Sequence, residues 1–414
     1  MLINLAYKSL LHRKGSIILT IITISVSIIV MLAVDHIRQQ AKLSFSSSVS
    51  GVDLIVGTRT GSLNLLLYSV FRTGTPTNNI SWTSYERISQ KPTINHAIPI
   101  SLGDSHQGYR VMGTTANYFE YFTYSNKQQL AFAQGHKFEH IFDLVLGAKV
   151  AKTLGYQLGD SIILSHGIGR TSFKNHDSIR FNVVGILAAT GTPVDQTLHT
   201  SLQGLEAAHL TKPADIKRLT QTAELTLSQV DDLKPKSITA IMLMLKSKMA
   251  VFTLQREINT DKQEPLSAIL PGVALSELWQ TMAVFDNTLH FITILVIISS
   301  LIGLNAILLA SIRERIHEIT LLRMVGASAG FIFLLIELEA IVIVLLSTTI
   351  ALVALSFLLP ISQTYVLNHY GILIDSNIIS KTNIELMFYF FIFTVIAAIP
   401  SALSAYKGAR NSHV

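Results

Sequence analysis

The chain has 414 residues, of which only 14% are charged, whereas an average soluble protein has about 25%. Hydrophobic residues make up 49%, and the mean hydropathy is +0.45. This composition disfavours a cytosolic enzyme and excludes a disordered or collagen-like chain. The net charge of +6 indicates either a nucleic-acid partner or a membrane face. Because the chain has no cysteine, disulfides and cysteine-based metal sites are excluded.

Four uncharged windows account for the missing charge. Each is close to the length of about 20 apolar residues with which a helix spans a bilayer. A cleavable signal peptide is the alternative for the first window, but its apolar run is too long. Buried core helices are the alternative for all four, and they would be unusually long. We therefore predict four transmembrane helices, at Gly15–Val34, Thr288–Ile312, Ile341–Leu359 and Leu386–Ala405.

The basic residues that flank these windows predict the orientation of the chain. Cytoplasmic loops carry an excess of Lys and Arg. Lys381 is the one basic residue between the third and fourth windows, whereas eight lie at the two termini and between the second and third. We therefore expect both termini in the cytoplasm, Asp35–Asn287 outside it, and a lipid bilayer rather than nucleic acid as the charged partner. The eight are Lys8, Arg13, Lys14, Arg313, Arg315, Arg323, Lys407 and Arg410.

The long segment between the first and second windows predicts a globular domain. Strand-like and helix-like runs alternate irregularly between Gly and Pro residues, which is typical of an α+β fold. The polar stretch 211–237 reads as a connection between two lobes. The strand candidates are Val52–Val56, Ala97–Leu102, Tyr109–Met112, Leu144–Leu146, Ser161–Leu164, Ile179–Leu187 and Ala240–Leu245, and the helix candidates are Trp82–Ser89, Ala148–Leu154, Ser201–His209 and Lys246–Asn259.

The expected fold is thus an α-helical membrane protein with four transmembrane helices and a large α+β extracytoplasmic domain inserted between the first and second spans. Residues 275–288 keep a helical period, so we expect one helix to run from the domain into the second span; an ordinary helix cap is the alternative. The expected parts are an interfacial helix 1–14 (or the frayed start of the first span), a span 15–34, the domain 35–287, a span 288–312, a cytoplasmic helix 313–328, a span 329–360, an outer loop 361–384, a span 385–406 and a tail 407–414.

Sequence patterns for nucleotide binding and hydrolysis are absent. The chain contains no Gly-x-x-x-x-Gly-Lys-Ser/Thr and no His-Glu-x-x-His. Its expected cytoplasmic segments are too short to form a catalytic domain. We therefore expect no enzymatic activity and no bound cofactor in this chain.

The segment between the second and third windows predicts a short amphipathic helix that a partner can grip. Ile316, Ile319 and Leu322 share one helical side, Glu318 flanks it, and Gly326 ends the helix. A mere connector with interfacial charges is the alternative on spacing alone.

This loop resembles that of the FtsX-like permeases of the MacB type, also called type VII ABC transporters. Their pattern is Arg-x-Arg-Glu-Ile-Gly-Leu-Leu-Arg-Ala-Leu-Gly-Ala-Ser, from which His317, Thr320 and Met324 depart. The order of one span, a large domain and three spans is also similar, so the resemblance covers essentially the whole chain. The loop matches at Arg315, Glu318, Ile319, Leu321, Leu322, Arg323, Gly326, Ala327 and Ser328.

The resemblance implies a permease of the bacterial inner membrane, with its large domain in the periplasm. Two permease copies, or one copy and a paralogue, pair above a dimeric cytoplasmic ABC ATPase, which holds ATP and Mg. ATP-driven conformational changes of the ATPase then move the periplasmic domain by mechanotransmission. An adaptor, a lipoprotein or an enzyme would be a further partner. Glu318, Arg323 and their neighbours from Arg315 to Ala327 would contact the ATPase.

Three residues of the expected third and fourth spans, 329–360 and 385–406, are candidates for a structural role inside the membrane. Glu337 and Glu339 are ionisable, and such residues are functional candidates by default. We favour helix packing over proton relay for Glu339. Pro400 lies in an Ala-containing run that resembles the end of the family.

Nine histidines between His36 and His209 raise the question of metal binding. His136 and His140 would share one face of a helix, which suits a metal. Solvated surface is the more ordinary interpretation of such a pair.

An apolar strip at Ser62–Phe71 lies outside the expected membrane segments. We consider it as a surface for a lipid-bearing substrate or partner, with the domain core as the alternative. Its candidate contact residues are Leu63, Leu65, Leu66, Leu67, Tyr68 and Phe71.

Three functions are consistent with these features. The first is an ABC permease for export or extraction of a lipoprotein, a peptide or a small molecule. The second is a non-transporting transmitter that regulates an extracytoplasmic enzyme. The third is a metal-related transport component, and a membrane sensor is disfavoured because no output domain exists.

Overall fold

A computed structural model describes residues 14–411 except 126, 167–178, 211–218, 220–224, 231–232, 315, 371–374 and 376–379. The expected interfacial helix at residues 1–14 lies outside the described residues except for Lys14. The chain divides into two compact units. A helical unit comprises Met1–Gln40, Ala283–Thr364 and Ile374–Val414, and an α/β unit comprises Ala41–Met282 and Tyr365–Leu373.

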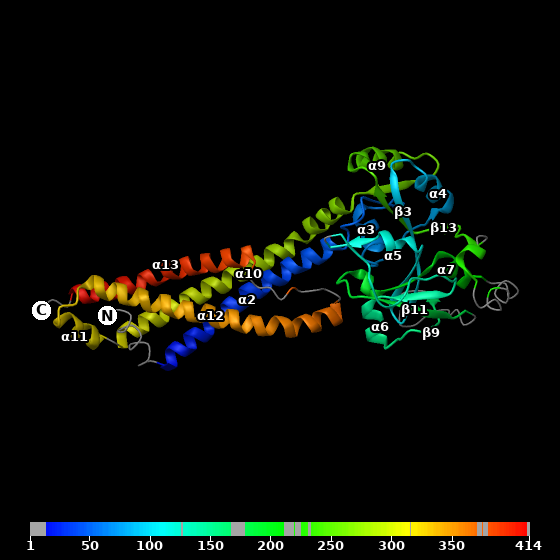
Figure 1. The fold of residues 1–414 in the computed structure, drawn as a ribbon. Coiled ribbons are helices and arrows are strands. Elements are labelled where there is room, and N and C mark those ends of the chain that lie inside the picture. Colours follow the sequence, from blue (N-terminus) through cyan, green and yellow to red (C-terminus); the bar gives the residue numbers. More distant parts are fainter. Residues whose placement is uncertain are drawn as a thin grey trace. The chain divides into compact units, whose positions relative to one another are not determined.

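Four long helices are the elements able to cross a bilayer among the described residues (Figure 1). Each contains one of the four uncharged windows, so the prediction of four spans is confirmed by length and composition. All are longer than a bilayer requires, since about 20 residues suffice. They are α2 (Lys14–Ser47), α10 (Pro271–Glu314), α12 (Ala329–Tyr370) and α13 (Lys381–Asn411).

The surface of the helical unit carries large apolar side chains, including Phe291, Phe357 and Phe388. Several polar side chains are hydrogen-bonded inside the unit, where no water is available. Ser25 Oγ donates to the Ser347 carbonyl at 3.1 Å, which ties α2 to α12. An apolar outer surface with polar side chains gathered inside is the pattern of a membrane protein.

The two glutamates of α12 are both buried within the helical unit. Glu337 has no hydrogen-bond partner at either carboxylate oxygen within the described part of the chain. Pro400 lies inside α13. Its neighbours Ala402 and Ala405 pack against Ile332 and Ile336 of α12, so small residues allow close approach of these two helices.

A mixed sheet forms the centre of the α/β unit. Within the described residues it has 11 strands, and β4–β12 and β8–β11 are its parallel pairs. The main path runs β15-β1-β14-β3-β4-β12-β8-β11-β7, with β10 on β3 and β9 on β11. The strands are β1 (Leu54–Thr58), β3 (Ile94–His106), β4 (Tyr109–Thr114), β7 (Phe132–Gly135), β8 (Asp143–Leu146), β9 (Ser161–Ile162), β10 (Ser165–His166), β11 (Phe181–Leu187), β12 (Thr197–Ser201), β14 (Ala240–Leu245) and β15 (Leu266–Ile269).

Short helices and two small ribbons surround this sheet (Figure 1). Ser81 caps α4 by accepting from Ser84 N at 3.2 Å, and Ser201 caps α7 by accepting from Gly204 N at 2.9 Å. The helices are α3 (Ser62–Ser69), α4 (Trp82–Ser89), α5 (Asn117–Tyr121), α6 (Ala148–Leu154), α7 (Leu202–Ala208) and α9 (Val251–Asn259), with 3-10 turns η1 (Pro193–Gln196), η2 (Leu227–Gln229) and η4 (Lys248–Ala250). The ribbons pair β2 (Ile80–Ser81) with β13 (Ser237–Ile238), and β5 (Thr123–Tyr124) with β6 (Gln128–Gln129).

The mixed α/β character of the domain agrees with the sequence prediction, and each strand candidate overlaps an observed strand. The helix candidates correspond to α4, α6, α7 and α9, although α9 begins five residues later than expected, after the turn η4. The sequence did not predict β12, whose residues Thr197–Ser201 are mostly polar yet all buried.

The helix that leaves the domain is continuous. α10 includes the whole of residues 275–288 and runs on to Glu314. The prediction of one unbroken helix at this place is therefore confirmed. At about 1.5 Å per residue, its 44 residues extend for about 66 Å.

Candidate functional site

The loop between α10 and α12 forms a short helix, α11 (Ile316–Met324). Ile319 packs towards Ile332 and Ile336 of α12 and is half-buried, as is Leu322. Ile316 is exposed, so the expected apolar side holds at Ile319 and Leu322 but not at Ile316. The helix therefore rests on the helical unit with one part of its surface and leaves the remainder open.

The end of α11 depends on a glycine in the left-handed region. Gly326 has a φ of 98°, which side chains with a Cβ rarely adopt. Ala327 N donates to the Leu322 carbonyl at 2.9 Å, and Arg323 Nη1 donates to the Ala327 carbonyl at 3.0 Å. These bonds satisfy carbonyls that the helix end leaves open. The expected role of Gly326 as helix terminator is thus present in the structure.

Glu318 is the exposed acidic residue in the first turn of α11. A carboxylate at this end is favoured by the helix dipole. It is available to a cationic or hydrogen-bonding group of another protein. Arg315 lies outside the described residues.

The histidine pair does not have the geometry of a helical metal site. His136 lies in an extended segment and His140 in an isolated bridge, so they do not share a helix face. His140 Nδ1 lies 3.3 Å from Asp143 Oδ2, whereas His136 Nδ1 bonds the Lys137 carbonyl. Among the described residues no group of three or more His, Cys, Asp or Glu side chains is placed to hold a metal. The helical argument for a metal at this pair is therefore wrong.

The apolar strip forms α3, which packs on the sheet. Leu65, Leu66 and Tyr68 are fully buried in the core, so the interpretation of these three as an exposed surface is corrected. Burial of such side chains stabilises a fold by about 1.5–3 kcal/mol each. Leu63, Leu67 and Phe71 are half-buried.

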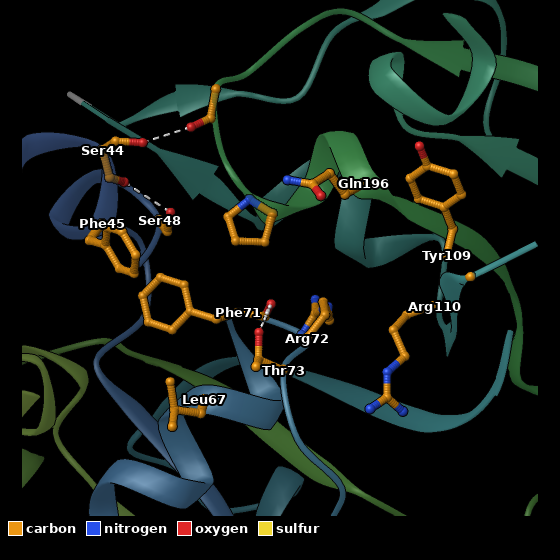
Figure 2. A pocket seen from close by; sticks show the side chains of 13 residues that line it. Ser44, Phe45, Ser48, Leu67, Phe71, Arg72, Thr73, Tyr109, Arg110 and Gln196 are labelled. Carbon is orange, nitrogen blue, oxygen red and sulfur yellow. Dashed lines mark hydrogen bonds between the residues drawn. The ribbon is translucent and has the colours of Figure 1, made fainter. Parts of the chain in front are cut away.

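A cavity of about 490 Å³ opens beside α3 within the α/β unit (Figure 2). Its walls come from the last turns of α2, the end of α3, the β3–β4 hairpin and the loop that leads into β12. The lining residues are Ser44, Phe45, Ser48, Leu67, Phe71, Arg72, Thr73, Gly108, Tyr109, Arg110, Gly191, Pro193 and Gln196.

Sheet register and a buried carboxylate fix the cavity walls. Thr197 pairs with Arg110 in the parallel β4–β12 ladder, which brings the preceding turn beside Arg110. Asp195 accepts from the backbone N–H groups of Thr190 at 2.8 Å and Gly191 at 2.8 Å, and so holds the loop. Burial raises the pKa of Asp195, and these bonds oppose the shift. The Gly191–Asp195 stretch thus acts as a structural loop at the cavity.

Arg72 is a buried cation at the cavity wall, with 9% of its surface exposed. Its Nε and Nη1 have no hydrogen-bond partner within the described part of the chain. Its φ of 56° is strained for a residue with a side chain, at a cost of about 1 kcal/mol or more. Burial lowers the pKa of Arg72, although an arginine stays charged at physiological pH.

Two further buried polar side chains lie near Arg72. Burial raises the pKa of Tyr118 to about 12, and burial together with the Arg72 charge lowers the pKa of His199 to about 3. The Tyr118 hydroxyl and both His199 ring nitrogens lack partners in the described residues. The two rings stack on one another with centroids 5.4 Å apart. A neutral histidine and a neutral tyrosine therefore surround a buried cation.

Sequence reasoning did not predict this cavity. Arg72 stands directly after the apolar strip and Arg110 within a strand candidate, 38 positions away. Only the pairing of distant segments places both at one cavity. The signal that was available is an arginine inside otherwise apolar runs, which demands a partner on burial.

Two family models match the chain. The model described as MacB-like periplasmic core domain matches residues 16–261, more than half of the chain, and the model described as FtsX-like permease C-terminal matches residues 290–411. None of the curated proteins compared with the chain matches it.

Solved structures with partial similarity include two periplasmic or extracellular domains. The periplasmic region of MacB from Actinobacillus actinomycetemcomitans is 12% identical, with 58% of this chain and 97% of that chain covered and a TM-score of 0.34. The extracellular domain of the noncanonic ABC-type transporter YknZ from Gram-positive bacteria is 9% identical, with 53% and 98% covered and a TM-score of 0.30.

The two family models together account for nearly all of the described elements, from α2 to α13. The four membrane-capable helices agree with a protein of the inner membrane. The chain belongs to the FtsX/MacB family of ABC-transporter permeases, the type VII transporters.

Proposed function

We propose that this chain is the transmembrane subunit through which a separate ABC ATPase moves a periplasmic domain. ATP and Mg are held by that partner, since this chain has no nucleotide-binding motif. The cargo class is a lipoprotein, a peptide or a small molecule, for export or extraction. The permease acts as a pair, either of two copies or of this chain with a paralogue.

The observation that carries the proposal is the exposed helix α11 between two membrane-capable helices. Glu318 stands free on its first turn, while Ile319, Arg323 and Gly326 hold its shape. An exposed short helix on a rigid support suits the groove of a soluble partner. We place α11, the termini and the ATPase on the cytoplasmic side, with the α/β unit in the periplasm between the first two spans.

The continuous helix α10 supports mechanotransmission. This helix is able to cross a membrane. Its first residues, up to Met282, belong to the α/β unit, and the residues from Ala283 on belong to the helical unit. A helix without a break passes on a push or rotation better than a flexible linker does. A non-transporting transmitter that regulates a periplasmic enzyme would use the same parts and differs only in its partner. No observation favours the metal-related alternative.

The test is capture of the ATPase by variants of α11. The full chain is coexpressed with an ABC ATPase encoded beside it, and Glu318→Ala is compared with Glu385→Ala. Glu385 is also exposed but lies near the start of α13, on the face that we place outside the cytoplasm. We expect at least about tenfold less ATPase with Glu318→Ala and wild-type capture with Glu385→Ala, at equal membrane insertion. Equal capture by both variants contradicts the proposal.

A further inference from the structure

The cavity beside α3 combines two buried cations with an apolar wall. Figure 2 shows Phe45 and Phe71 on one side and Arg72 and Arg110 on the other. Arg110 has 8% of its surface exposed and donates to the Gly74 carbonyl. Within the described part of the chain, neither guanidinium forms an ion pair with a carboxylate. Two positive charges therefore face one cavity, and no described carboxylate pairs with either of them.

A buried charge is costly unless an opposite charge or a full set of hydrogen bonds compensates it. The Tyr118 hydroxyl is near Arg72 and partly offsets the effect of burial on the pKa of Arg72. Arg72 Nε and Nη1 nevertheless have no hydrogen-bond partner among the described residues. Asp195, the nearby buried carboxylate, is already occupied by Thr190 and Gly191. An anion that enters the cavity would supply the missing compensation.

We propose that this cavity binds a phosphate group through Arg72 and Arg110, with an organic substituent of the ligand against Phe45 and Phe71. Guanidinium groups bind phosphate oxygens with paired N–H donors. A phosphate offers more oxygens and more charge than a carboxylate, which suits two arginines from separate elements. The phosphate is that of a lipid headgroup or of a soluble organic phosphate.

The size and lining of the cavity favour an organic phosphate. Its volume of about 490 Å³ lies within the range of roughly 300–1,000 Å³ that is usual for small-molecule sites. A phosphate ion would leave most of it empty. Phe45, Leu67, Phe71 and Pro193 line the remaining wall, and these side chains favour an apolar group.

The chain contains its own reporter for this site. Trp279 packs edge-to-face on Phe45 with ring centroids 5.6 Å apart, and Phe45 is 4.9 Å from Phe71. The chain has two tryptophans, so Trp82→Phe leaves Trp279 as the sole tryptophan, whose fluorescence can be excited apart from that of the tyrosines. A ligand against Phe45 and Phe71 changes the surroundings of that ring.

The experiment uses the full chain with Trp82→Phe, purified in a neutral detergent. Three probes are titrated: dihexanoyl phosphatidate, inorganic phosphate, and dihexanoylglycerol, which has the same tails but no phosphate. We expect a saturable change in Trp279 fluorescence with phosphatidate, weakened at least about tenfold by Arg72→Gln and by Arg110→Gln. Arg256→Gln is the matched control, because Arg256 is exposed on α9 and far along the chain from the cavity residues.

Each outcome decides the proposal. Saturation by phosphatidate alone supports it with a lipid source, and saturation by inorganic phosphate as well supports it with a soluble source. No saturation by either below about 10 mM overturns it, as does an equal response to dihexanoylglycerol. Wild-type binding in both arginine variants also overturns it. If circular dichroism shows that Arg72→Gln is not folded, the binding measured with Arg110→Gln tests the proposal instead.

Discussion

Single residues of the α/β unit show how burial and hydrogen bonding shift the pKa values of its histidines in opposite directions. His209 Nε2 lies 3.4 Å from Asp104 Oδ1, and this hydrogen bond is the main cause that raises the pKa of His209. His199 is fully buried, and burial lowers its pKa to about 3. The pKa values of these two histidines are therefore shifted in opposite directions. His209 stabilises the fold when protonated, whereas His199 must stay neutral.

The pH dependence that follows is specific to His209. A raised folded-state pKa gives stability that is complete below the unfolded pKa of about 6.5 and is lost as the pH rises through the raised value. We expect His209→Gln to lower the thermal midpoint of the full chain at about pH 5.5, with a smaller difference from wild type at about pH 8.5. Scanning fluorimetry across this range measures it.

His136→Gln provides the control, since His136 is exposed and its ring bonds a backbone carbonyl. The difference between the thermal midpoint of His136→Gln and that of wild type should stay constant across this pH range. A His209→Gln deficit that does not change with pH would show that the contact with Asp104 does not depend on charge.

At the scale of elements, α10 is the feature with the greatest consequence for the proposed mechanism. Val284 lies in the middle part of this helix and is 71% exposed, so its side chain contributes little packing. Proline inside a helix removes a hydrogen bond and clashes with the preceding turn, at about 3 kcal/mol. A substitution there changes the helix more than the packing around it.

We expect Val284→Pro to separate ATPase binding from movement of the α/β unit. The ATPase should still copurify with the variant, because α11 is unchanged. Limited proteolysis of the complex should give a pattern that depends on a non-hydrolysable ATP analogue for wild type and for Val284→Ala, but not for Val284→Pro. A nucleotide-dependent pattern in Val284→Pro would contradict transmission through an intact α10.

At the scale of the whole molecule, the orientation across the membrane is open to a direct test. The chain lacks cysteine, so any introduced cysteine is the only thiol. Met249 in the α/β unit is 90% exposed and Met324 at the end of α11 is 70% exposed. They form a matched pair of methionines on surfaces that we place on opposite sides of the membrane.

Labelling of spheroplasts with a membrane-impermeant maleimide should modify Met249→Cys and spare Met324→Cys. Permeabilisation should then allow modification of both. The positive-inside rule is the physical reason for this expectation, because cytoplasmic segments retain Lys and Arg. Modification of Met324→Cys in sealed spheroplasts would invert the proposed topology.

The sequence predicted the helical unit better than the details of the α/β unit. A membrane helix is a local property, because each window must satisfy its own backbone and present apolar side chains to lipid. Gly326 likewise ends α11 through a local left-handed turn. The strands that the sequence did not predict do not follow from local properties. β12 is polar in composition, and its burial between β4 and β8 comes from pairing with strands distant in sequence.

Sequence alone thus determined the four membrane-capable helices, the unbroken α10, the short helix α11 and the family resemblance that the family models confirm. Tertiary structure alone decided that Leu65, Leu66 and Tyr68 are core rather than surface, and that His136 and His140 share no helix face. It also decided that Arg72 and Arg110 meet at one cavity. The physical reason is the sequence distance over which each property is determined. Helix length and hydropathy are local properties of a segment. Burial and the convergence of charges depend on which distant segments pair.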